Sequence, residues 1–286
     1  MKIYAFADEA DAKIDGQIAA MKRNRLNGLE IRGVDGENIS DITPEKAKEV
    51  RKKLEDNGLI VWSLGSPIGK IKIEDDFAAH LEKLKHTLEI GNLLGAENIR
   101  LFSFYLPEGS DFDAYADEVL NRVGQLAECA VMAGISPCHE NEKGIFGDSI
   151  ERCLTLYESL PLLQGVFDPA NFVQCGVDAA VAWKMLKPYI KYLHIKDALP
   201  DGAVVPAGKG AGHLAEIVKE YAAFGGQAVT IEPHLAVFDG LKELEQSGNT
   251  SDVGGYRYPN NQTAFDAACE AFQKLFEEEG QREKSR

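Results

Sequence analysis

The sequence lacks any long apolar run. A membrane-spanning helix needs about 20 consecutive apolar residues, and no stretch of this chain approaches that length. The first residues, MKIYAFADEADAK, carry acidic side chains at once and contain no apolar segment of the secretory type. We therefore expect a protein that is not exported by a standard signal, does not bind membranes and works in the cytoplasm.

Cysteine is scarce and follows no pattern. The five cysteines show no C-x-x-C spacing and are odd in number: Cys129, Cys138, Cys153, Cys175 and Cys269. This arrangement argues against a disulfide framework and against a zinc site built from thiolates. It fits a reducing compartment.

Basic residues are outnumbered by acidic ones. Lys and Arg number 31 against 46 Asp and Glu, which gives a formal net charge of −15. A chain with this balance repels the phosphates of nucleic acids, so we expect no nucleic-acid partner. A small-molecule partner fits better, and the sequence leaves a homo-oligomer open.

Strand-like and helical patterns alternate along nearly the whole chain. The eight strand-like runs are 2–8, 28–32, 59–66, 98–104, 135–141, 164–168, 190–197 and 227–232. Helix starts lie between these runs. Thr43 followed by Pro44 predicts an N-cap, and Asp148 with Glu151 has the spacing of a capping box.

Eight strand–helix units predict the α/β class and a single (β/α)8 TIM barrel. We expect one domain over residues 1–286, because no Pro-, Gly- or Ser-rich linker divides the chain. An open doubly wound sheet is the alternative, but no G-x-G-x-x-G follows the first run. Two segments interrupt the alternation. We predict that 233–261 is an active-site loop that closes as a lid, and that 277–286 is a charged tail that frays.

Charged residues gather at the carboxyl ends of the predicted strands. Side chains alternate across a strand, so each run divides into a set facing the helices and a set facing the barrel interior. The interior set at these ends consists of Glu30, Arg32, Glu140, Asp168, His194, Lys196 and Glu232. Enzymes with this fold build their sites from such positions.

Taken singly, each of these residues has an ordinary interpretation. An acid at a strand end is usually solvated or caps the next helix, and a buried histidine is usually a hydrogen-bonded core residue. Glu140, Asp168, His194 and Glu232, however, would converge from four neighbouring strands. Three buried carboxylates repel one another unless a cation compensates them. One divalent metal ion is the simplest remedy, and this donor set favours Mn²⁺, with Mg²⁺, Co²⁺ and Zn²⁺ as alternatives.

Several motifs carry a resemblance to a known family. They are HEN (139–141), FDPAN (167–171), LHIKD (193–197), IEPH (231–234), FADEA (6–10), LEIR (29–32), GSPIGK (65–70) and AGKG (207–210). The chain resembles the xylose-isomerase-like TIM-barrel family of sugar and sugar-phosphate isomerases and epimerases, which includes D-tagatose 3-epimerase and inosose dehydratase. The resemblance implies a metal held by Glu140, Asp168, His194 and Glu232, with both glutamates as acid–base groups. Asn171 stands where many of these epimerases have histidine, so the resemblance does not assign a substrate.

The implied reaction begins with loss of a proton next to a carbonyl. A metal ion polarises a hydroxy-ketone and makes that proton more acidic. Glu140 and Glu232 on opposite faces would then move the proton, giving isomerisation or epimerisation through an enediolate. Departure of a β-hydroxyl would instead give dehydration, so a keto-polyol lyase of the inosose-dehydratase type is the alternative.

Five residues are predicted to contact the substrate: Glu30, Arg32, Lys70, Asn171 and Lys196. The two lysines would hold a substrate oxygen or a phosphate. Glu30 with Arg32 would contact hydroxyls or form an ion pair without catalytic consequence. Asn171 would donate a hydrogen bond to substrate or only cap the turn after the sixth strand.

Two other function classes share this fold. Type IV AP endonucleases need more metal ligands for three zinc ions and a basic DNA face, and six histidines with a net charge of −15 speak against them. A sugar-binding barrel without catalysis would not need to retain all four candidate ligands.

Overall fold

Eight parallel strands close into a barrel in the computed structural model, which describes the backbone of residues 1–238 and 256–284. The order around the barrel is β1, β12, β9, β8, β7, β6, β5, β2. The strands are β1 (Lys2–Ala5), β2 (Gly28–Ile31), β5 (Ile60–Leu64), β6 (Asn98–Leu101), β7 (Ser136–Glu140), β8 (Gln164–Phe167), β9 (Ile190–Ile195) and β12 (Ala228–Ile231). All eight predicted strands are present, so the prediction of a (β/α)8 TIM barrel is confirmed.

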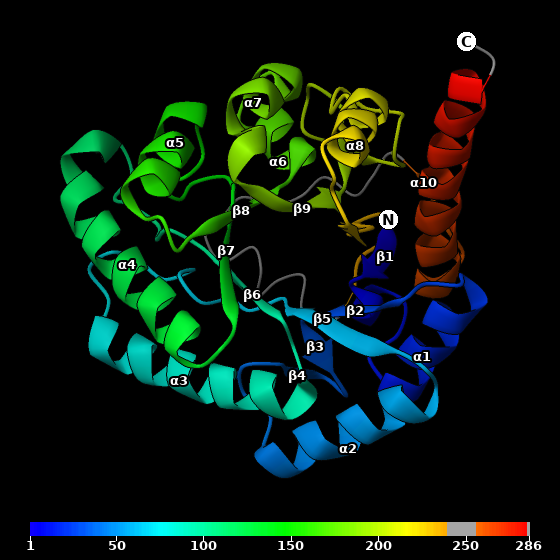
Figure 1. The fold of residues 1–286 in the computed structure, drawn as a ribbon, viewed down its shortest axis with the longest axis horizontal. Helices are drawn as coiled ribbons and strands as arrows, with labels where there is room; N and C mark the ends of the chain where they lie inside the picture. The colour runs from blue at the N-terminus through cyan, green and yellow to red at the C-terminus, as the bar shows by residue number, and fades with distance from the viewer. Residues whose placement is uncertain (239–255, 285–286) are drawn as a thin grey trace.

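Helices surround the barrel (Figure 1). They are α1 (Ile14–Arg23), α2 (Pro44–Asp56), α3 (Phe77–Leu94), α4 (Ala116–Met132), α5 (Ile150–Ser159), α6 (Pro169–Gln174), α7 (Ala179–Leu186), α8 (Leu214–Ala223) and α10 (Asn261–Lys284). None of the helices in the described ranges is long and apolar enough to cross a membrane.

The segment expected as a fraying tail forms part of a helix. Residues 277–284 continue α10 without a break, and the fraying expected of the charged tail over 277–286 stays a prediction. The helix is tied to the start of the chain, because Arg23 Nε in α1 lies 2.8 Å from Asp266 Oδ2 in α10. Of the predicted lid, 233–261, residues 239–255 lie outside the described part of the chain.

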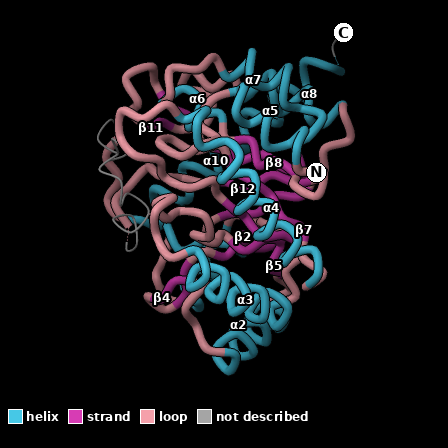
Figure 2. The backbone as a smooth tube through the Cα atoms, turned by 90° about the vertical axis from the view of Figure 1, so that its left-hand side faces the viewer, coloured by secondary structure: helices cyan, strands magenta, loops and turns pink. Residues whose placement is uncertain are grey.

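Two short antiparallel hairpins extend the loops that follow barrel strands. They are β3 (Gly33–Val34) with β4 (Glu37–Asn38), and β10 (Asp197–Ala198) with β11 (Val204–Val205). The sequence patterns did not predict them, since two-residue strands carry no periodic signal. Figure 2 shows β4 and β11 on the same side of the barrel, opposite the N-terminus.

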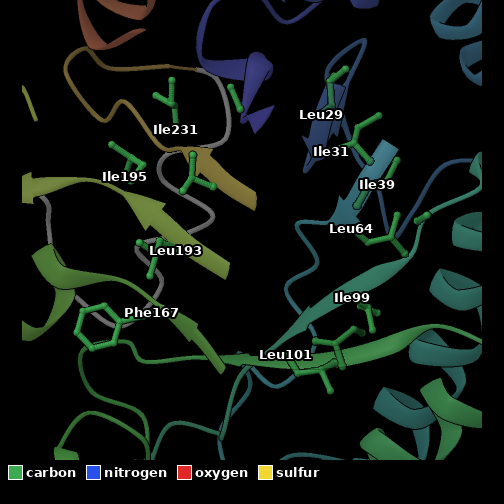
Figure 3. Packing of buried hydrophobic residues seen from close by; sticks show 14 of the residues in the cluster. Leu29, Ile31, Ile39, Leu64, Ile99, Leu101, Phe167, Leu193, Ile195 and Ile231 are labelled. Atoms are coloured by element: carbon green, nitrogen blue, oxygen red, sulfur yellow. The ribbon is translucent and has the colours of Figure 1, made fainter. Parts of the chain in front are cut away.

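The core has two layers. The larger one lies between strands and helices, and Leu29, Ile31, Leu193, Ile195 and Ile231 belong to it (Figure 3). The smaller one fills the barrel interior with Tyr4, Trp62, Cys138, Val166, Tyr192 and Ala228. Alternation along each strand therefore sends large aliphatic side chains outward and leaves the inner positions to aromatic, small and polar side chains.

Of the two helix caps predicted from the sequence, one is confirmed and one is wrong. Thr43 caps α2, and its hydroxyl accepts a hydrogen bond from the amide of Lys46 at 3.2 Å. The cap predicted at Asp148 is wrong by one residue, because Ser149 caps α5 and accepts from the amide of Arg152. Asp148 instead pairs with the side chain of Arg152.

We expect Thr43→Ala to lower the free energy of unfolding by about 1 kcal/mol, because an amide of the first turn loses its acceptor. Thr43→Ser keeps the oxygen and should cost clearly less. Denaturant unfolding of the two variants and the parent measures this difference. An equal loss in both variants would assign the effect to the methyl group and contradict the capping role.

Candidate functional site

The carboxyl ends of four neighbouring strands bring the predicted metal ligands together. Glu140 ends β7, Asp168 follows β8, His194 lies in β9 and Glu232 follows β12. Each residue offers one ligand atom, and these atoms all lie within 4.8 Å of one another. All four side chains are buried. We call these four residues the ligand cluster.

The outer core layer fixes the direction of the ligand cluster. Leu193 and Ile195, on either side of His194, belong to the layer packed under the helices, as does Ile231 before Glu232 (Figure 3). Because neighbouring side chains on a strand point to opposite faces, burying these aliphatic residues outside turns His194 and Glu232 toward the barrel axis.

His194 lies between the three carboxylates of the ligand cluster and a deeper carboxylate, that of Glu30. Its Nδ1 is 2.9 Å from Glu140 Oε1 and 3.5 Å from Glu232 Oε2. Its Nε2 is 3.1 Å from Glu30 Oε2, and the Tyr192 hydroxyl donates to Glu30 Oε1 at 2.8 Å. Burial lowers the pKa of His194, but Glu140 and Glu30 outweigh it and hold that pKa well above its ordinary value. The imidazole is therefore oriented from below with Nδ1 toward the other ligands.

The carboxylates of the ligand cluster differ in protonation. Burial raises the pKa of Glu140 and Glu232, but neighbouring cations outweigh burial and lower both pKa values below the ordinary range. For Asp168, burial dominates, and Lys196 only partly offsets it, so the pKa rises to about 7. At neutral pH both glutamates are ionised while Asp168 is partly protonated.

Lys196 is a cation inside the cluster. Its Nζ lies 2.9 Å from Asp168 Oδ2 and 2.9 Å from Glu232 Oε2. Burial lowers the pKa of Lys196, but these two carboxylates outweigh burial and raise it well above its ordinary value. The ammonium is charged, and its contact with a substrate oxygen stays a prediction.

Arg100 is a site residue that the sequence interpretation missed. It lies in β6, and its Nη1 is 3.1 Å from Glu140 Oε2 while its Nη2 donates to the carbonyl of Gly65. The strand NIRL places Asn98 and Arg100 on the interior face by the same alternation that revealed the other residues. That pattern was the available signal.

Arg32 and Glu30 occupy different places, although the sequence suggested a pair. Arg32 contacts Asp8 Oδ2 at 2.9 Å and Glu9 Oε1 at 3.0 Å, and it approaches Glu232 Oε1 at 3.5 Å. Within the described residues no ion pair joins Arg32 to Glu30, so the predicted ion pair between them is wrong. Glu30 is fully buried beneath His194. Their roles as substrate contacts stay predictions.

Asn171 supports the ligand cluster from its own helix. Its side-chain amide donates to Glu140 Oε1 at 3.3 Å and to the carbonyl of Asn141 at 2.9 Å. Its backbone amide donates to Asp168 Oδ1 at 2.8 Å, so Asp168 also caps α6. Asp168 rather than Asn171 is therefore the cap of the turn after β8, and contact of Asn171 with a substrate stays a prediction.

Lys70 lies apart from the ligand cluster. Its Nζ is 2.8 Å from Glu142 Oε2 and 4.4 Å from the centre of the Phe102 ring. The cation–π contact and the ion pair fix the ammonium beyond the end of β7, where Glu142 follows Glu140 by two residues. Its contact with a substrate stays a prediction.

Asp197 is a second residue that sequence interpretation missed. Its two oxygens accept hydrogen bonds from the amides of Ala198, Gly208, Gly210 and Gly212, each at 2.9 or 3.0 Å. Gly210 and Gly212 approach so closely that a Cβ at either would lie within 2.7 Å of Asp197 Oδ1. The AGKG turn is thereby fastened beside Lys196.

The donor set fits a divalent metal ion. Glu140 Oε2 and Asp168 Oδ2 accept no hydrogen bond from the described residues, although Arg100 and Lys196 lie near them. Three carboxylates and one imidazole nitrogen are ligands for Mn²⁺, Mg²⁺, Co²⁺ or Zn²⁺. Glu30 on the far nitrogen of His194 is the outer carboxylate that metal-bound histidines commonly have.

Known proteins resemble this chain in sequence family and in fold. A family model described as a xylose isomerase-like TIM barrel matches residues 18–245. No curated protein matches the sequence. Solved structures of other proteins share its fold.

An L-ribulose 3-epimerase superposes with a TM-score of 0.74 at 17% identity, covering 99% of this chain and 96% of that one. The probable 3-DHS dehydratase AsbF from Bacillus anthracis gives 0.73 at 16% identity, covering 96% and 99%. The IOLI protein, which holds a zinc atom, gives 0.72 at 13% identity, covering 97% and 99%. With the family model matching most of its length, the chain belongs to the xylose isomerase-like TIM barrel family.

Proposed function

We propose that this protein is a divalent-metal-dependent isomerase or epimerase of small carbohydrates, free or phosphorylated. The observation that carries the proposal is the ligand cluster: one imidazole and three carboxylates within 4.8 Å at the carboxyl ends of four strands. Structural neighbours that include an epimerase of a ketose support the substrate class.

The ligand cluster would hold the metal, with Mn²⁺ favoured. Bound there, a divalent ion would polarise a carbonyl and a neighbouring hydroxyl of the substrate and acidify the proton between them. Within the protein, His194 presents Nδ1 for this purpose because Glu30 occupies Nε2. Asn171 holds Glu140 in place through Oε1.

Proton transfer would fall to Glu140 and Glu232. They come from β7 and from the loop after β12, so they face the interior from different sides of the barrel. The cations that lower their pKa values keep both ionised, and an ionised oxygen is required to accept a proton from carbon. One glutamate would take the proton and the substrate would become an enediolate. Return of a proton to the neighbouring carbon would give isomerisation, and return to the same carbon from the opposite glutamate would give epimerisation.

Dehydration is the second candidate, and Lys196 is the observation that favours it. Its ammonium is held at 2.9 Å from Glu232, so a base and a proton donor lie side by side. A departing hydroxyl needs such a donor. The dehydratase among the structural neighbours makes this reaction a reasonable comparison. Mass spectrometry of the product separates the two candidates, because only dehydration removes water.

We expect metal binding to release protons. His194 and Asp168 both have raised pKa values without metal, so more of each is protonated as the pH falls, and a metal ion must displace those protons. As the pH is lowered from about 8 to about 6, the affinity for Mn²⁺ should fall with each pH unit. The fall should be about tenfold per pH unit for each proton that binding releases. Calorimetry of metal-free protein in two buffers of different ionisation enthalpy counts the protons.

Asp168→Asn is the matched variant for this measurement. It should bind Mn²⁺ more weakly and release fewer protons, because an amide has none to give. An affinity for Mn²⁺ that does not change with pH, or the absence of any tight divalent ion in folded protein, would contradict the proposed metal centre.

We expect Glu140→Gln and Glu232→Gln to slow proton abstraction by about 10²–10⁴-fold, because glutamine keeps the size but removes the base. The measurement is deuterium wash-in from D₂O at the carbon next to the carbonyl, with a panel of free and phosphorylated ketoses and Mn²⁺-loaded protein. Glu128→Gln, on the exposed face of α4, is the control and should match the parent. Parent rates in both site variants would rule out the assignment.

A further inference from the structure

A cavity lies at the end of the barrel opposite the ligand cluster. It has a volume of about 650 Å³ and is lined by Lys2, Tyr4, Trp62, Lys187, Lys191 and Phe224, among others. Lys2 begins β1 beside Ala228 at the start of β12, which places the cavity at the amino ends of the strands. Its volume falls in the range of small-molecule sites, about 300–1,000 Å³.

Two buried donors at this cavity have no partner. Tyr4 and Trp62 stack with ring centroids 5.1 Å apart, and they are 0% and 9% exposed. Tyr4 Oη and Trp62 Nε1 make no hydrogen bond with any described residue. An unmet buried polar group costs about 1–3 kcal/mol, so two of them beside one cavity indicate acceptors that enter it. Burial, and then Glu97, raises the pKa of Tyr4 to about 12, so its hydroxyl keeps the proton to donate.

The cavity is basic in an otherwise acidic protein. Three lysines and a single carboxylate, that of Glu97, line it, against a net charge of −15 for the chain. Among the described residues, Lys2 and Lys191 form no ion pair, while Lys187 pairs with Glu220 at 3.2 Å. Uncompensated ammonium groups beside open donors favour an anion.

Some of the residues that line the cavity between the lysines are aromatic or aliphatic. Trp183, Tyr221 and Ile190 line the cavity, and the Phe224 ring beside it is 66% exposed. An exposed aromatic ring next to Lys187, whose Nζ lies 5.6 Å from the ring centre, offers contact area to a planar or aliphatic body. An anionic head and an apolar body would therefore both find matching surface.

We propose that this cavity is a second binding site, for a small organic anion that carries a carboxylate or phosphate group on an apolar body. The site is separate from the ligand cluster, because the layer of Tyr4, Trp62 and Tyr192 lies between them. Tyr192 marks the upper side of that layer, where its hydroxyl bonds to Glu30.

Both tryptophans of the chain, Trp62 and Trp183, line the cavity, so intrinsic fluorescence reports on it directly. The test titrates the full-length protein with benzoate, phenyl phosphate, inorganic phosphate and neutral benzyl alcohol. We expect a saturable change with benzoate or phenyl phosphate, and the tighter of the two identifies the head group. No saturable change with either, or equal binding of benzyl alcohol, overturns the proposal. If inorganic phosphate binds as tightly as phenyl phosphate, the part of the proposal that gives the ligand an apolar body is wrong.

Three variants locate the binding. Lys191→Ala should weaken it by about 5- to 30-fold, and Tyr4→Phe by a similar factor, the loss expected for one hydrogen bond. Tyr4→Phe should not lower the free energy of unfolding, because the lost hydroxyl has no partner in the folded chain. Lys52→Ala, on the exposed face of α2, is the control and should bind like the parent.

Two outcomes would overturn the assignment to this cavity. One is unchanged affinity in both Lys191→Ala and Tyr4→Phe. The other is loss of affinity in Glu232→Gln with parent affinity in Lys191→Ala, which would place the probe at the ligand cluster. Neither outcome bears on proton transfer at the ligand cluster, which deuterium wash-in measures separately.

Discussion

The compensation of buried negative charge is the constraint on which the rest of the site depends. Six acidic side chains lie near one mouth of the barrel: Asp8, Glu9, Glu30, Glu140, Asp168 and Glu232. The cations that contact them are Arg32, Arg100, Lys196 and protonated His194. Acids outnumber these cations, and Asp168 responds by retaining part of its proton. An arrangement that costs several kcal/mol of desolvation persists because its charges are matched, and a divalent cation would complete the match.

The closed sheet and the convergence of the four residues of the ligand cluster could be predicted because both follow from local pattern. Alternation along β9 separates Leu193 and Ile195 from His194, and the same rule applies at Glu140 and Glu232. A barrel strand can be predicted from the alternation of inward and outward side chains together with a turn at each end. The fold and the position of the site can thus be predicted from strands of four to six residues.

What could not be predicted depends on contacts between distant segments. Arg32 meets Asp8 and Glu9, which reach it only through the turn after β1, and no pattern within either segment specifies that meeting. The cap at Ser149 competes with Asp148, whose preference for Arg152 is a tertiary outcome. Asp197 in hairpin β10–β11 accepts hydrogen bonds from amides of a loop more than ten residues away. Predicting each of these contacts requires the positions of both partners in the folded chain.

Closure of the barrel between β1 and β12 has a consequence for how the chain folds. Lys2 pairs with Ala228 and Ala5 with Ile231, so the last seam of the sheet joins residues separated by most of the chain. Contacts of such sequence separation form late, because a long loop must be closed before they are made. Glu232 directly follows β12 at this seam. The ion pair between Arg23 and Asp266 joins α1 to α10. During synthesis the site therefore cannot assemble before nearly all of the chain has emerged, and the folding order makes the ligand cluster one of the last parts of the molecule to form.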